Sequence, residues 1–91
     1  MRKAPAAFNR ICAAFQGDMK RGDLDPVEFI RRIIVDNSKP EEWSELKDFV
    51  DYVLRVPYTE KDMEILYYSN SPDYQFFPIK GYYLLLSKAL E

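Results

Sequence analysis

The side chains best able to take part in chemistry in this sequence are carboxylates that recur at intervals of three or four residues. They are Glu41, Glu45, Asp48 and Asp51, with Tyr52 next to the last of them. Residues spaced in this way share one face of an α-helix. A row of carboxylates on one surface suits either acid–base catalysis by paired carboxyl groups or electrostatic recognition of a basic partner.

Catalysis is the weaker of these two interpretations. Desolvation is what tunes a catalytic carboxylate, and acids on the polar side of a helix are expected to stay exposed. The chain has no His, the commonest general base and metal ligand. Its one cysteine, Cys12, excludes an internal disulfide and a thiolate zinc site, and its apolar neighbours predict a buried, inert thiol. We therefore expect no enzyme, no cofactor and no metal.

The charge distribution favours a protein partner over nucleic acid. The net charge is −2, but residues 36–64 carry nine acids and four bases, a local balance of −5. This local excess indicates either an ordinary solvated helix face or an acidic surface that meets a basic partner. The basic pairs Lys20-Arg21 and Arg31-Arg32 are small for a nucleic-acid patch. Asp18, Asp23 and Asp25 resemble a calcium loop only loosely, because Lys20 stands where a ligand belongs.

Hydrophobic spacing predicts the helices that must position these residues. Apolar residues at intervals of three and four predict a first helix carrying Phe8 to Phe15 and ended by Gly17, and later helices at about 25–37, 38–56, 59–68 and 79–90. N-cap residues followed three positions later by an acid mark three helix starts. These are Asp25 with Glu28, Ser38 with Glu41, and Thr59 with Asp62. The expected fold class is all-α, a small bundle of about five short helices in a single domain over residues 1–91.

The turn-rich segment at residues 69–78, which we call the aromatic turn, holds three aromatic side chains. A loop with so many aromatics must pack back on the body of the domain or meet a partner. Asp73 and Tyr74 in this turn are therefore second candidates for partner binding, after the acidic row and Tyr52. The oligomeric state stays open, because exposed tyrosines could also join two copies of the chain.

Targeting signals are not evident. No apolar run approaches the roughly 20 residues that a membrane helix needs. The residues after Met1 become charged too soon for a signal peptide. We expect a cytoplasmic protein with no membrane partner.

The order of these features resembles one family of contact-dependent growth inhibition immunity proteins, small bacterial antidotes to a delivered toxin. The resemblance extends over nearly the whole chain and depends on the combination of weak motifs. The segments that carry it are Phe15 to Met19, Asp23 to Ile30, Ser38 to Leu54, Tyr58 to Asp62, Tyr74 to Pro78 and Ser87 to Leu90.

The resemblance implies a cytoplasmic protein that binds and neutralises the C-terminal toxin domain of a cognate effector, often a nuclease. A nuclease has a basic cleft, which an acidic helix face with an embedded tyrosine could fill as a phosphate mimic. The expected toxin-binding residues are Glu41, Glu45, Asp48, Asp51, Tyr52, Asp73 and Tyr74. A helical adaptor for another protein is the main alternative, and a nucleic-acid regulator and an enzyme are weaker ones.

Overall fold

The computed structural model describes residues 2–16 and 25–91 and confirms the all-α class. In these two stretches there are five α-helices, one short 3₁₀ helix and no strand. The α-helices are α1 (Ala6–Ala13), α2 (Pro26–Asn37), α3 (Trp43–Arg55), α4 (Glu60–Tyr68) and α5 (Lys80–Ala89), and the 3₁₀ helix is η1 (Pro40–Glu42). The longest described helix, α3, has 13 residues, and no helix of the described residues has the length and apolar character to span a bilayer.

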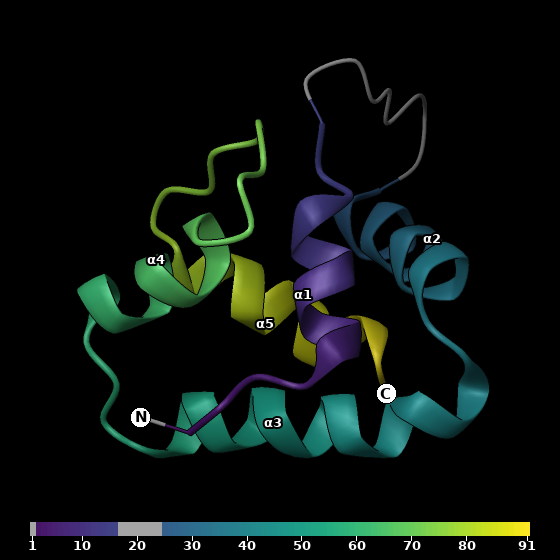
Figure 1. The fold of residues 1–91 in the computed structure, drawn as a ribbon, viewed down its shortest axis with the longest axis horizontal. Helices are drawn as coiled ribbons and strands as arrows, with labels where there is room; N and C mark the ends of the chain where they lie inside the picture. Colours follow the sequence, from purple (N-terminus) through teal and green to yellow (C-terminus); the bar gives the residue numbers. More distant parts are fainter. Residues whose placement is uncertain (1, 17–24) are drawn as a thin grey trace.

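The helices surround a single hydrophobic cluster to which all five contribute. α5 packs against both α2 and α3, while α1 packs against α2 and α4. Figure 1 shows α1 and α5 in the middle of the molecule, with α3 crossing below them and α2 and α4 on the two flanks. This arrangement leaves the outer side of α3 uncovered by any other helix in the view.

Aromatic rings fill the centre of the core. Phe15 is fully buried, and its ring meets those of five other aromatic residues at centroid distances of 5.5 to 6.2 Å. These neighbours are Phe29, Tyr67, Tyr74, Phe76 and Tyr82. Most of the pairs meet edge to face, the geometry that ring quadrupoles favour. Three helices and the aromatic turn are thus joined through one side chain.

Buried polar atoms in this core have partners. The Tyr83 hydroxyl donates to the Met63 carbonyl at 2.8 Å, and the Tyr82 hydroxyl lies 3.3 Å from Cys12 Sγ. Burial raises the pKa of Tyr82 and Tyr83, and it raises the pKa of Cys12 to about 12. Cys12 is fully buried, so the prediction of a buried thiol is confirmed, and its raised pKa disfavours the reactive thiolate.

Two of the three predicted helix starts are confirmed at their N-caps. Asp25 accepts from the Glu28 amide at 2.9 Å, but the Glu28 carboxylate pairs with Arg31 instead of completing the capping box. Thr59 and Asp62 form both halves of theirs, at 3.1 and 3.2 Å. A capping box therefore forms only where no charged side chain nearby competes for its acidic residue, as Arg31 does for Glu28.

The third predicted start is wrong. Ser38 is the C-cap of α2, and its hydroxyl donates to the Ile34 carbonyl at 2.5 Å. The next turn begins after Lys39, whose amide donates to Glu42 Oε1 at 2.9 Å, so Glu42 takes the role expected of Glu41. Pro40 explains the shift, because it restricts Lys39 to extended backbone and suits the first position of the new turn.

The predicted end of the first helix is also wrong. α1 ends at Ala13, so Phe15 lies beyond the helix although its ring reaches the core as expected. The Phe15 carbonyl accepts amides of the aromatic turn, from Asp73 at 2.8 Å and Tyr74 at 3.4 Å. The Phe15 carbonyl therefore binds the aromatic turn, whereas a longer helix would have required it to accept the amide four residues later. The predicted terminator, Gly17, lies outside the described residues.

Candidate protein-binding surface

α3 separates its apolar and acidic residues by helical periodicity. Its inner side is fully buried and consists of Leu46, Phe49, Val50 and Val53. The acids lie outside this buried side, because 3.6 residues per turn place positions 48 and 51 nearly opposite its centre and positions 45 and 52 together on one flank. Burial of the inner side therefore fixes the direction in which the acids point.

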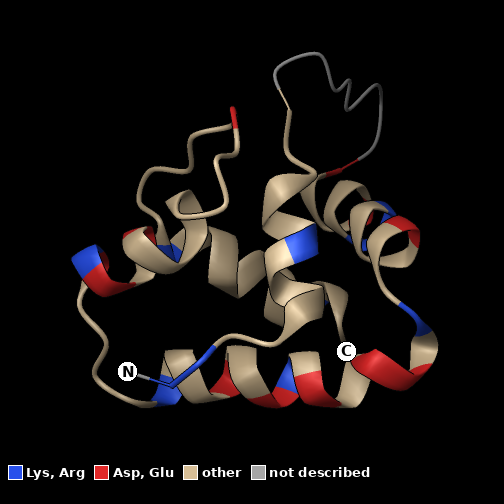
Figure 2. Cartoon of the chain, viewed as in Figure 1, with Lys and Arg blue, Asp and Glu red and all other residues tan. Residues whose placement is uncertain are grey.

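The row is confirmed as a surface for its α3 members. Glu45 and Asp48 are exposed, and Asp51 and Tyr52 are half-buried. Arg55 stands one turn after Asp51 and Lys47 lies on the flank, so Figure 2 shows blue segments among the red ones along α3. The ion pairs that join two described residues are Arg10–Glu42 and Arg31–Glu28. Neither involves an acid of α3, which leaves these carboxylates available to a partner.

Glu41 lies apart from the others, in η1. It lines a shallow depression between α1, α2 and η1 together with two basic side chains, Arg10 and Lys39. This site has mixed charge, so Glu41 contributes less to a continuous acidic surface than the predicted helix implied. The physical reason is again Pro40, which starts a 3₁₀ turn in place of the first turn of α3.

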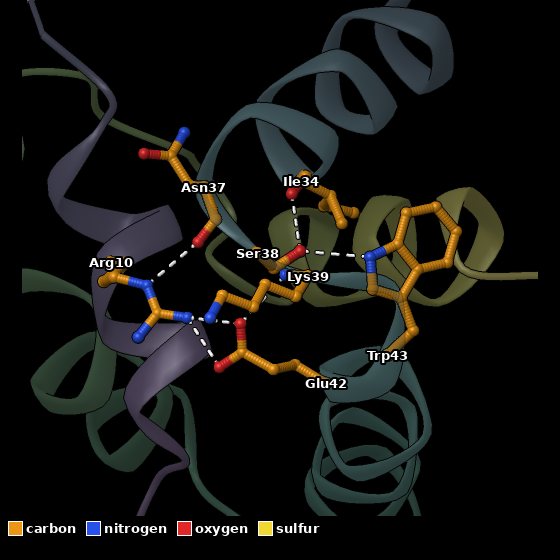
Figure 3. Close-up of polar contacts among 7 residues, drawn as sticks. All are labelled: Arg10, Ile34, Asn37, Ser38, Lys39, Glu42 and Trp43. Carbon is orange, nitrogen blue, oxygen red and sulfur yellow. Dashed lines mark hydrogen bonds and ion pairs between the residues drawn. The ribbon is translucent and has the colours of Figure 1, made fainter.

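An arginine fork holds the start of α3 in place. Arg10 of α1 binds both Glu42 carboxylate oxygens, at 2.6 and 2.7 Å, and its Nε donates to the Asn37 carbonyl at 2.9 Å (Figure 3). On the other side, Trp43 Nε1 donates to the Ser38 hydroxyl at 3.1 Å. Arg10 thus uses one nitrogen, Nη2, for the carboxylate and another, Nε, for the carbonyl, and two donors of one planar group fix its orientation as well as its position. The fork joins α1 to the α2–α3 corner and so sets the angle of the acidic helix.

Glu42→Gln is expected to make the stability of the protein less dependent on pH in the acid range. The pKa of Glu42 is held below its ordinary value of 4.5, mainly by the hydrogen bonds from Arg10 and next by the one from the Lys39 amide. A carboxyl group with a lowered folded pKa stabilises the fold above the ordinary pKa, and that contribution is lost as pH falls through the folded pKa. Urea midpoints measured from about pH 5 to pH 3 should fall less in Glu42→Gln than in the unmodified chain. If the urea midpoints of both proteins fell equally with pH, the Arg10–Glu42 pair would not be the cause. The control is Glu64→Gln, which changes an exposed carboxylate on α4.

Tyr52 is held between two neighbours at the C-terminal half of α3. Its ring meets the Tyr58 ring edge to face at a centroid distance of 5.9 Å. The Arg2 guanidinium carbon lies 5.1 Å from the centroid of the Tyr52 ring and 6.0 Å from that of the Phe49 ring. The Arg2 amide also donates to the Tyr58 hydroxyl at 3.0 Å. Tyr52 is therefore oriented, and part of its surface is already in contact with a cation of the chain itself.

The second pair of predicted site residues lies on another part of the molecule. The aromatic turn connects α4 to α5 and rises away from α3 in Figure 1. The Tyr74 ring packs on Phe15 and Phe29, and the Tyr74 carbonyl accepts the Tyr67 hydroxyl at 3.1 Å. Asp73 is exposed, while its amide binds the Phe15 carbonyl. The structure thus does not join Asp73 and Tyr74 to the acidic residues of α3, and Tyr74 serves largely in packing.

Phe77 of the aromatic turn is exposed, although it was not among the predicted site residues. Its side chain is 98% exposed, whereas Phe76 next to it is half-buried against the core. Close to the turn, an apolar depression is lined by Pro26, Phe29, Ile30, Tyr74, Phe76 and Leu85. An aromatic side chain without packing partners is a common feature of binding surfaces. Adjacent identical residues give no sequence signal to tell which one faces outward.

The other chemically capable side chains of the described part of the chain are its possible metal ligands and its arginines. There, no group of three or more His, Cys, Asp or Glu side chains could hold a metal ion. The Arg31 side chain pairs with Glu28 and also donates to the Ala89 carbonyl at 3.3 Å, so it has a structural role. The loosely calcium-like acids Asp18 and Asp23, and the pair Lys20-Arg21, lie outside the described residues.

Comparison with known proteins gives no relative from which a function could be transferred. No protein-family model matches the chain, and neither does any curated protein or solved structure. The function must therefore be inferred from this chain's own residues.

Proposed function

We propose that this protein is an immunity protein of the contact-dependent growth inhibition type. It binds the C-terminal toxin domain of a cognate effector in the bacterial cytoplasm and neutralises it, and that toxin is a nuclease. The protein itself acts by occupancy and carries out no reaction. The observation that carries the proposal is the side of α3 that no other helix covers, where the exposed acids Glu45 and Asp48 form no ion pair and share a face with the oriented Tyr52.

Charge supports this partner class. A nuclease must attract a polyanion, so its active-site surface is basic. Carboxylates one helical turn apart, such as Glu45 and Asp48, offer it negative charge at short, regular intervals. Opposite charge on the two surfaces speeds association and disfavours wrong partners. Because the acidic side of α3 would occupy the same basic cleft that binds nucleic acid, the protein and the toxin's substrate would compete for that cleft.

Tyr52 supplies what charge alone does not. Tyrosine is frequent among the few residues that dominate binding energy, because its ring gives contact area at low cost in side-chain entropy. Its contact with Tyr58 at 5.9 Å reduces the number of rotamers it can adopt before binding. Asp48, one turn earlier on α3, provides a charge next to this anchor.

Co-purification with a toxin tests the proposal. The chain is expressed with the toxin domain encoded immediately upstream of its gene, and only the toxin carries a tag. We expect the chain to be recovered with the toxin and to restore growth of cells that express it. Recovery without rescue would contradict neutralisation, and absence of both would contradict the immunity function.

A helical adaptor that binds a different protein is the second candidate, and Phe77 is the observation that favours it. Phe77 is almost fully exposed and lies in the turn beside an apolar depression, a combination that does not depend on a basic partner. If no toxin complex forms, this surface becomes the primary one. Phe77→Ala would then be the variant that separates the two interactions, because it leaves every residue of α3 unchanged.

A further inference from the structure

The N-terminal segment, residues 2–5, runs along the acidic helix. It starts at the C-terminal half of α3 and passes toward the first turn of α1 in Figure 1. Its two charged residues are both basic: Arg2 lies over Tyr52, and Lys3 lines a surface depression together with Glu45. A short basic stretch of the chain is thus laid against the same side of α3 on which the proposed toxin partner would dock.

Contacts of Arg2 hold the start of this segment on α3. Residues 2–5 have no regular secondary structure, and α1 begins after Pro5 without a side-chain cap. The polar contact that fixes its end is the hydrogen bond from the Arg2 amide to Tyr58. Arg2 and Lys3 form no ion pair with any described residue. Ala4 packs against the core and the Pro5 carbonyl accepts the Asn9 amide at 3.3 Å, so residues 2 and 3 are the part that can leave α3 without unfolding a helix.

The Arg2 guanidinium shows which chemistry the surface accepts. It lies over two rings, at 5.1 Å from Tyr52 and 6.0 Å from Phe49, within the range of cation–π attraction. Acids of the same helix, Glu45 and Asp48, provide the negative potential around it. A guanidinium over an aromatic ring, on a helix that also carries carboxylates, is a contact that arginine makes readily.

We propose that Arg2 occupies, in the unbound protein, the place that an arginine of the partner takes in the complex. The N-terminal segment is then an internal competitor, and Tyr52 with the neighbouring acids is an arginine-binding site. The identity of the partner rests on the proposed function, whereas the existence of the site and the competition do not. Removal of Arg2 should uncover the site and strengthen the binding of basic ligands.

A basic peptide tests this without any toxin. The probe is a hexa-arginine peptide, titrated into the 15N-labelled protein and followed through amide shifts of residues 45–52. We expect Arg2→Ala to bind the probe about two- to five-fold more tightly than Lys3→Ala, the range that an exposed cation–π contact supplies. Lys3→Ala is the matched control, because it removes the same charge from the neighbouring residue and leaves the ring contact in place.

The double variant Arg2→Ala/Tyr52→Leu completes the test. It should lose the gain in affinity, because the ring that receives the cation is gone while an apolar side chain keeps the packing. Equal affinities of Arg2→Ala and Lys3→Ala would overturn the proposal, because net charge alone would then explain the effect. A gain that survives without Tyr52 would overturn it as well. A failed toxin co-purification, by contrast, would count only against the immunity function.

Discussion

Phe15→Ala is expected to lower the free energy of unfolding by about 3–5 kcal/mol, the usual cost of deleting a buried phenylalanine ring. Phe15 is fully buried and contacts five aromatic rings from α2, α4, α5 and the aromatic turn. None of these neighbours can move to fill the space without leaving its other contacts. A chain of this length has on the order of 5–14 kcal/mol of stability, so the loss is a large part of the total.

Urea denaturation followed by far-UV circular dichroism measures this change. Phe77→Ala is the matched control. It deletes the same ring from the aromatic turn, at a side chain that is 98% exposed. We expect it to change stability by less than about 0.5 kcal/mol, as surface substitutions usually do. Similar losses in both variants would show that the ring cluster around Phe15 does not stabilise the fold as described.

Asp48→Lys combined with Asp51→Lys is expected to weaken toxin binding by about a hundredfold while helicity stays unchanged. Reversal of two charges replaces attraction to a basic cleft by repulsion, and charged contacts at protein interfaces are commonly worth several kcal/mol. Asp48 is exposed and Asp51 half-buried, and neither forms an ion pair or caps a helix. The substitutions should therefore affect binding without unfolding α3. Titration calorimetry against an inactivated toxin domain measures the loss.

The control for this experiment is Glu60→Lys combined with Glu64→Lys. Both glutamates are exposed on α4, and the pair changes the net charge by the same amount. If binding depends on the acids of α3, the control should keep most of its affinity, with a modest loss that salt suppresses. Equal losses in the two double variants would mean that only total charge matters, and the acidic side of α3 would lose its special role.

Local signals in the sequence account for much of the architecture. The alternation of apolar and acidic residues in α3 fixes which side is buried, because helical geometry allows only one orientation in which Phe49 and Val53 both leave water. Asp25 and Thr59 mark helix starts because their side chains bind amides only three residues away. Such interactions are complete within one turn and need no knowledge of the rest of the fold.

The predictions were wrong where the role of a residue depends on partners outside its own helix. Ser38 looks like an N-cap, but it serves as the end of α2 because Pro40 delays the next turn and Trp43 and Ile34 use its hydroxyl. The acidic row was predicted as one surface, whereas Glu41 falls in a mixed-charge depression lined by Arg10. In each case the deciding partner is a residue or a turn that the periodicity of one helix does not contain.

The sequence by itself determined the all-α class, the inner and outer sides of α3, and the burial of Cys12, because each follows from spacing along a single helix. Only the tertiary structure decided what surrounds the candidate site. It placed Arg2 over Tyr52, separated Asp73 and Tyr74 from the acidic side of α3, and buried Phe76 while leaving Phe77 exposed. These outcomes depend on how segments far apart in the chain pack together, and local spacing carries no information about such contacts.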